Sequence, residues 1–153
     1  MRCRSFSELA RDKRGAGLIE FAIALPVLLV MMLGIVDVAT CYSAQFTLEQ
    51  AAARSLERVQ VTGGRTERAS VRAEAASAAG VPEANVTVED WLECDGTRQS
   101  ASVLLCPTGQ GSARYLQVTI NSSYAPYFAY SPLGARQGDG SVALTASSAL
   151  RIS

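Results

Sequence analysis

Few side chains of this chain have the type and spacing that catalysis needs. The sequence has no histidine, and its only lysine, Lys13, precedes a long apolar run, so a Ser-Lys pair is not available beyond that run. Glu89, Asp90 and Glu93 are close together in sequence, but neighbouring residues of a strand point to opposite faces. A paired-carboxylate site needs both groups on the same bond of a substrate. We therefore expect a protein that is not an enzyme.

The sequence is also poor in sites for cofactors and nucleic acids. A zinc site needs about four cysteine, histidine or carboxylate ligands, whereas Cys94 and Cys106 are not a close pair and no histidine can join them. Gly63 and Gly64, and Gly109 and Gly111, are isolated turn signals, unlike a phosphate-binding loop. Arginines after residue 50 are interleaved with acidic residues, which is not typical of a nucleic-acid surface. We expect no metal, no cofactor and no nucleic-acid partner.

One carboxylate is unusual because of its position. Uncharged residues run unbroken from Phe21 to Val36, and Glu20 lies directly before them. Residues 18–19 and 38–42 extend the run to the roughly 20 residues that cross a bilayer. A carboxylate beside hydrocarbon is costly and is tolerated only with a reason. The run predicts a membrane-spanning helix that begins with a functional acid.

The charges on either side of the run predict its orientation. Five basic and two acidic residues precede Gly15, a net charge of +3, and the rest of the chain carries −3. By the positive-inside rule the N-terminus is cytoplasmic and the chain beyond Asp37 is exported. We interpret Asp37 as a solvated carboxylate at the outer edge of the membrane. A cleaved secretory signal is the alternative, but cutting after Ala39 or Ala44 would place Asp37 or Tyr42 in the recognition site.

The residues around Glu20 form a pattern with known counterparts. Gly15 is followed by four residues, then by Glu20 and the aromatic Phe21 at the head of the apolar run. This pattern resembles the processing site of type IV prepilins. More closely, Arg14–Glu57 resembles the TadE-like family of the tight-adherence (Flp) pilus system, and Val142–Ser153 is similar to that family's closing strand.

The resemblance implies a role in pilus assembly. A prepilin peptidase of the inner membrane would cut after Gly15, which makes 1–15 a cytoplasmic leader peptide and Ala16 the new N-terminus. The α-amine of Ala16 would then pair with Glu20 of the same or a neighbouring subunit. The alternative is that Glu20 only reaches the lipid headgroups. The implied partners are the prepilin peptidase, other pilin or pseudopilin subunits, the inner-membrane Tad platform and membrane lipid.

Periodicity predicts the elements that hold these residues. Helical spacing continues past the membrane run, so one helix is expected from Gly17 to Gln60. A second helix is expected from a cap at Thr66 through Ala79. Alternating apolar residues then predict three strands, near 86–92, 116–120 and 142–152.

Together these elements predict an α+β fold of pilin-like plan. It has a long N-terminal helix, transmembrane at first and amphipathic later, a second short helix, and a small antiparallel sheet of about three strands. The expected divisions are the leader at 1–15, the transmembrane helix at 16–42 and a periplasmic TadE-like globular domain, including the helix extension, at 43–153.

The cysteines and one aromatic segment add expectations for the exported part. Cys94 and Cys106 are twelve positions apart across a loop, and in an oxidising compartment we expect them to form a disulfide. Closing a loop of that size is worth about 3 kcal/mol. Cys41 is interpreted as a small apolar residue, although a free thiol there can link two copies. The aromatic segment 124–132 covers the sheet or serves as a partner surface.

The sequence therefore favours a minor pilin or pseudopilin that is required for assembly of a Flp/Tad pilus, a structure for adhesion and biofilm formation. It would be a single-pass protein of the bacterial inner membrane, with its C-terminal domain in the periplasm or in an extracellular pilus. The leading alternative is an uncleaved bitopic scaffold or accessory protein of the Tad secretion machinery. A third interpretation is an exported adhesin domain whose anchor is only a tether.

Overall fold

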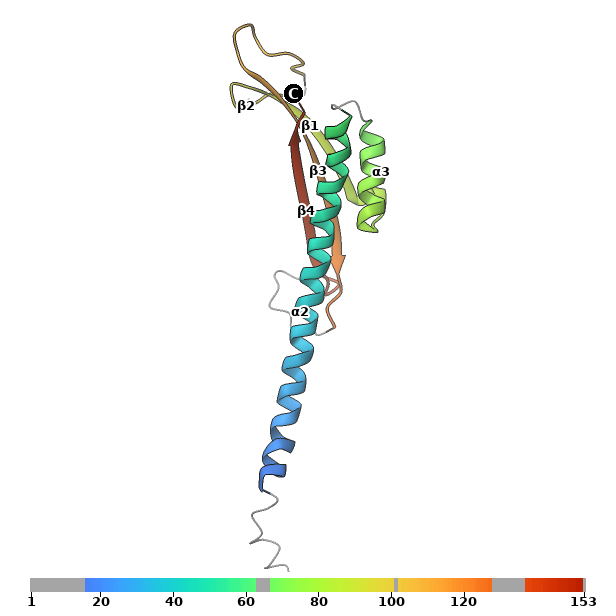
Figure 1. Ribbon diagram of the computed structural model, residues 1–153, viewed down its shortest axis with the longest axis vertical. Helices are drawn as coiled ribbons and strands as arrows, with labels where there is room; N and C mark the ends of the chain where they lie inside the picture. The colour runs from blue at the N-terminus through green and yellow to red at the C-terminus, as the bar shows by residue number, and fades with distance from the viewer. Residues whose placement is uncertain (1–15, 63–66, 101, 128–136, 153) are drawn as a thin grey trace, which may run out of the picture.

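The computed structural model describes residues 16–62, 67–100, 102–127 and 137–152. They form the predicted α+β fold, with two helices followed by an antiparallel sheet. Helices α2 (Ala16–Val61) and α3 (Arg68–Ala79) lead through the short 3-10 turn η2 (Glu83–Asn85) into the sheet. The strands are β1 (Val86–Cys94), β2 (Thr97–Arg98), β3 (Ser112–Tyr124) and β4 (Val142–Arg151). The second half of α2 and the other elements together form one head, and the first half of α2 projects from this head (Figure 1).

Helix α2 confirms the predicted long helix and continues through Pro26 without interruption. Its 46 residues span about 70 Å at a rise of 1.5 Å per residue. Large apolar side chains from Leu18 to Val36 are exposed, so this half contributes nothing to the core. The second half is amphipathic and buries positions three and four residues apart, namely Asp37, Cys41, Leu48, Ala51, Ala52, Ser55, Leu56 and Val59.

Helix α3 packs against the C-terminal half of α2 and buries Val71, Ala75 and Ala76. Gly80 ends it in the left-handed conformation at φ 66°, as expected for a glycine that follows a helix. The amide of Val81 then donates to the carbonyl of Ala76, which satisfies one of the last carbonyls of the helix. Its N-cap position is Glu67, and the predicted cap at Thr66 lies outside the described residues.

The sheet has four strands in the order β2-β1-β3-β4, one more than predicted. All neighbours are antiparallel, with Val88 opposite Val118 and Ile120 opposite Ala146. The apolar residue of each alternating pair faces the helices, which is the pattern of a sheet with one buried face. The buried set is Val86, Val88, Leu92, Leu116, Val118, Ile120, Val142, Leu144 and Ala146.

The additional strand is the two-residue β2, which folds back on the end of β1. Asp95 and Gly96 form the connecting turn, with φ values of 49° and 78°. Asp-Gly is a preferred pair for a two-residue hairpin turn because both positions need a positive φ. This dipeptide was the sequence signal for the fourth strand, but the prediction of about three strands did not take it into account.

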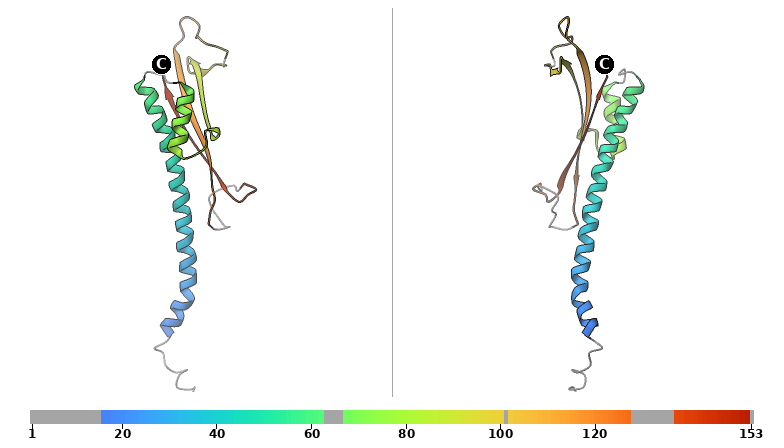
Figure 2. Two further views of the ribbon diagram at one scale, coloured as in Figure 1. Left: turned by 90° about the vertical axis from the view of Figure 1, so that its right-hand side faces the viewer. Right: turned by 60° about the vertical axis from the view of Figure 1, so that its left-hand side comes forward.

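The head has two distinct ends along the axis of α2. The end of β3 and the start of β4 lie beside the middle of α2, and we call this the hairpin end (Figures 1 and 2). The turn between β1 and β2 and the start of β3 lie beyond the C-terminal part of α2, and we call this the disulfide end (Figures 1 and 2). The projecting half of α2 is therefore nearest to the hairpin end.

Candidate functional site

The predicted processing motif lies at the very start of α2. Ala16 is the first residue of the helix, and Gly15 lies outside the described residues. Glu20 and Phe21 follow in the first two turns, and both side chains are exposed. Within the described part of the chain, Glu20 has no hydrogen bond and no ion pair. Its carboxylate is thus available to a partner outside these residues.

A stripe of exposed apolar residues begins in the same turns and extends along α2. Its members alternate three and four residues apart, which places them on one side of a helix in the spacing of a coiled-coil seam. We call this the exposed seam, and it consists of Phe21, Leu25, Leu28, Met32, Ile35, Ala39, Tyr42 and Phe46. It continues past Asp37 into the half of α2 that carries the head.

Asp37 corrects one prediction. It was interpreted as a solvated carboxylate, but its exposed fraction is only 5%. The Tyr124 hydroxyl donates to the Asp37 Oδ1 atom at 2.8 Å, and the amide of Tyr127 donates to the same atom at 3.1 Å. Burial of the Asp37 carboxylate is tolerated because charge-assisted hydrogen bonds replace those that it would make to water.

Asp37 and its partners join the hairpin end of the sheet to α2. Tyr124 is the last residue of β3, and its hydroxyl is also hydrogen-bonded to that of Thr40. The Thr40 hydroxyl lowers the pKa of Tyr124, but burial and the Asp37 carboxylate raise it, so that the pKa lies above the ordinary 10.0. Asp37 could have been assigned to this face, because it lies four residues before Cys41 on the buried side of the helix.

The aromatic segment 124–132 is described as far as Tyr127. Tyr124 is half-buried and fixed to α2 by its hydroxyl, in line with the predicted role as cover. The Tyr127 side chain is 80% exposed, and only its backbone amide contacts Asp37. Phe128 to Pro132 lie outside the described residues.

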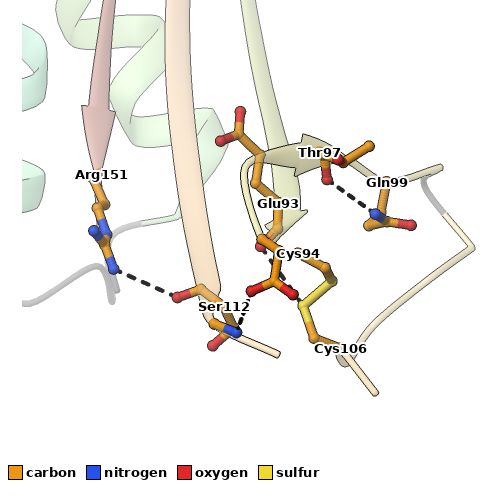
Figure 3. The surroundings of a disulfide bond; sticks show 9 residues. Glu93, Cys94, Thr97, Gln99, Cys106, Ser112 and Arg151 are labelled. Atoms are coloured by element: carbon orange, nitrogen blue, oxygen red, sulfur yellow. Dashed lines mark hydrogen bonds between the residues drawn. A yellow bond between two sulfur atoms is a disulfide. The ribbon is translucent and has the colours of Figure 1, made fainter. Parts of the chain in front are cut away.

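The disulfide end contains the second predicted pair of residues. Cys94 and Cys106 are joined in a disulfide with their Cα atoms 5.6 Å apart, which closes the loop between β1 and β3 onto the end of β1 (Figure 3). Asp95 adds a second tie, because its Oδ1 accepts a hydrogen bond of 2.8 Å from the Gly111 amide. Cys41 is a buried free thiol, as expected of a small apolar residue.

The acidic residues of β1 do not form a carboxylate pair. Glu89 lies 3.5 Å from Arg98, and Asp90 forms an ion pair with Arg68 of α3. The carboxylate of Glu93 accepts a hydrogen bond of 2.8 Å from Trp91. Each acid has its own partner, so the geometry offers no general acid and base acting together.

These features define a class of protein with a small α+β head on one helix that is long and apolar enough to cross a membrane. Residues 15–56 match the family model of TadE-like proteins, as the resemblance of this segment indicated. TadE-like proteins are a pilus-associated structural family. The match covers the predicted processing motif and nearly all of α2. No curated protein and no solved structure matches the chain.

Proposed function

We propose that this chain is a minor pilin or pseudopilin of TadE type, required for assembly of a Flp/Tad pilus and so for adhesion and biofilm formation. Residues 1–15 are a cytoplasmic leader peptide that a prepilin peptidase removes after Gly15. Residues 16–42 cross the inner membrane, and residues 43–153 form the periplasmic domain, which can enter an extracellular pilus.

The observation that carries this proposal is the exposure of the apolar half of α2. Ala16, the residue that cleavage after Gly15 would leave at the N-terminus, lies in α2. None of the most apolar window of α2 is buried in the head. Cleavage would therefore release a chain whose N-terminal residues lie in an exposed apolar helix, which can pack against lipid or against other pilin helices.

Glu20 supplies the register of this packing. It lacks a partner within the described chain, and a carboxylate near hydrocarbon costs less when it is paired. The α-amine of Ala16, created by the cleavage, is the nearest cation by sequence, and that of a neighbouring subunit is equally suitable. A pair with the amine of a neighbouring subunit fixes the axial position of one helix against the next, which lipid headgroups would not do.

The exposed seam supports contact with other helices rather than with lipid alone. Tyr42 and Phe46 are 55% and 58% exposed although they lie in the half of α2 that carries the head. Large exposed apolar side chains that gather beside a folded head are typical of a surface that binds a partner. Other pilin or pseudopilin subunits are the proposed partners of the seam, and the inner-membrane Tad platform is the site of assembly.

Mass measurement of the mature N-terminus tests the processing step. We expect a species that begins at Ala16, and a Gly15→Leu variant should retain the leader and serve as the control. An intact chain that begins at Met1 or Arg2, with normal piliation, would contradict the proposal. It would favour the uncleaved bitopic scaffold of the Tad machinery.

A further inference from the structure

The two edges of the sheet are protected to different degrees. The outer edge of β4 lies against α2, and Gln45 Nε2 donates to the Thr145 carbonyl at 3.0 Å. On β1, strand β2 covers only Glu93 and Cys94, and the Gln99 amide adds one bond to the Leu92 carbonyl. Within the described residues, no strand pairs with this side of β1 from 86 to 91. An open edge of this kind is a template for an additional strand.

A groove of about 560 Å³ follows this open edge. It is bounded by the first residue of α3 on one side and by the loop after β2 on the other. Its lining includes Arg68, Asp90, Trp91, Arg98, Leu104 and Arg114. A second hollow of about 390 Å³ adjoins it and shares Leu92, Leu104 and Arg114.

The arginines of the groove differ in what they contact. Arg68 is paired with Asp90, and Arg98 lies 3.5 Å from Glu89 with its guanidinium 4.4 Å from the centre of the Trp91 ring. Arg114 is half-buried, and its side chain has no hydrogen bond or ion pair among the described residues. A half-buried guanidinium without an acceptor is suited to binding a carboxylate.

The same end of the head also exposes apolar side chains. Leu104 and Leu105 are 72% and 84% exposed on the loop that the disulfide closes. They are held beside Arg114, because the disulfide fixes this loop to the end of β1. The groove thus combines free backbone groups, one free guanidinium and an apolar wall.

We propose that the open edge of β1 binds an extended segment of another protein that carries a carboxylate between apolar residues. The segment adds to the sheet as a strand through the backbone groups of residues 86–91. Its carboxylate pairs with Arg114, and a neighbouring apolar side chain packs on Leu104. Main-chain bonds supply the binding energy, and the two side-chain contacts select the segment.

A second copy of this chain does not fit as the occupant. Strand β1 runs along the long axis of the molecule, roughly parallel to α2 (Figure 1). Symmetric antiparallel pairing of two β1 edges would turn one copy upside down, so that the two apolar halves of α2 would project in opposite directions. Two copies anchored in one membrane exclude that arrangement, so the β1 edge of a second copy is not the occupant, and we assign the segment to a different protein.

The test uses the full-length protein in detergent micelles. The probe is a capped seven-residue peptide of alternating threonine and valine in which one valine is replaced by glutamate. Trp91 is the only tryptophan of the chain and lines the groove, so its fluorescence reports binding. We expect a saturable change in fluorescence with the glutamate peptide. A peptide with glutamine in place of this glutamate should bind about tenfold more weakly, since a charge-assisted bond is worth roughly 1.5 kcal/mol or more. A peptide that is N-methylated on alternate amides should not bind.

Two variants separate the effect of the Arg114 guanidinium from the effect of positive charge in general. Arg114→Gln should abolish the preference for glutamate over glutamine, whereas Arg72→Gln, an exposed change on α3 outside the groove, should retain it. Hydrogen exchange should slow at the amides of Val88 and Asp90 when the glutamate peptide is bound. Equal binding of all three peptides to the unmodified protein, or no saturable binding, would overturn the proposal whether or not Arg114→Gln folds. These outcomes do not depend on cleavage at Gly15.

Discussion

Asp37 shows how a single carboxylate can connect two distant parts of the chain. It is buried, and two hydrogen-bond donors from the described part of the hairpin end approach one of its oxygen atoms. The sequence placed Asp37 at the outer edge of the apolar run correctly but did not indicate its donors. Tyr124 and Tyr127 are 87 and 90 positions away, and only the folded sheet brings them to α2.

Removing this carboxylate should destabilise the head. In Asp37→Ala the Tyr124 hydroxyl and the Tyr127 amide lose their common acceptor, which should cost about 1–3 kcal/mol of unfolding free energy. Denaturant unfolding in detergent measures the change. Tyr127→Ala is the matched control, because it keeps the backbone amide and its side chain is exposed. A loss in the control as large as in Asp37→Ala would contradict this account.

The same cluster predicts a dependence of stability on alkaline pH. Because the pKa of Tyr124 is raised above 10.0, the native state holds this proton more tightly than the unfolded chain does. Its contribution to stability is complete below pH 10 and is lost as the pH rises through the native pKa. Unfolding midpoints from pH 8 to 11 should therefore fall more for the unmodified protein than for Tyr124→Phe. Parallel curves would show that Tyr124 is not coupled to Asp37 in this way.

Glu20 gives a residue-scale test of assembly. Glu20→Ala should leave membrane insertion intact, because it removes a charge from the start of an apolar helix, but it should block or strongly reduce piliation. Pilus counts and membrane fractionation measure the two effects separately. Glu57→Ala, an exposed change in the second half of α2, should alter neither. Normal piliation in Glu20→Ala would remove the amine-pairing role.

At the scale of elements, the repeat of apolar residues predicted an element best where it extended over a long segment. Helix α2 was predicted as Gly17 to Gln60 and is Ala16–Val61. Strand β3 was predicted at 116–120 and extends from Ser112 to Tyr124, through the polar run 121–123. Those polar residues remain in the strand because β4 pairs with them, as Asn121 does with Thr145. Pairing between strands is not visible in the alternation of one strand, so β1 and β3 were predicted too short.

The exposed seam predicts which face of α2 assembly requires. Tyr42→Ser combined with Phe46→Ser should reduce piliation and leave the unfolding free energy nearly unchanged, since both side chains are exposed in the single chain. Gln50→Ser, a change at an exposed polar position farther along α2, is the control for helix propensity. If the double variant unfolds earlier but still forms normal pili, the seam serves stability and not assembly.

At the scale of the whole molecule, composition and the repeat of apolar residues predicted the helices and the sheet but not the contacts between them. The α+β arrangement followed from one long apolar helix and later alternating segments. The placement of the head on α2 from Asp37 onward depends on contacts between residues that are far apart in sequence, such as Gln45 with Thr145. The groove beside β1 was not predicted either, since it is formed by α3, β1 and the loop after β2 together.

The disulfide should stabilise the head as a whole. Replacing Cys94 and Cys106 with serine should lower the unfolding free energy by about 3 kcal/mol, because the unfolded chain gains a free loop. Chemical unfolding with and without reductant measures it. Cys41→Ser should keep the sensitivity to reductant, since Cys41 is not in the bridge. Insensitivity of the unmodified protein to reductant would contradict the prediction.

The unbroken course of α2 also has a mechanical consequence. A helix that runs from Ala16 to Val61 without an intervening loop gives its two halves no joint at which they can move separately. A pull at the Ala16 end that advances the helix by one turn, about 5.4 Å, therefore displaces the head by the same amount. Helix α2 therefore transmits an axial displacement of its apolar half to the sheet through the contacts around Asp37 and β4.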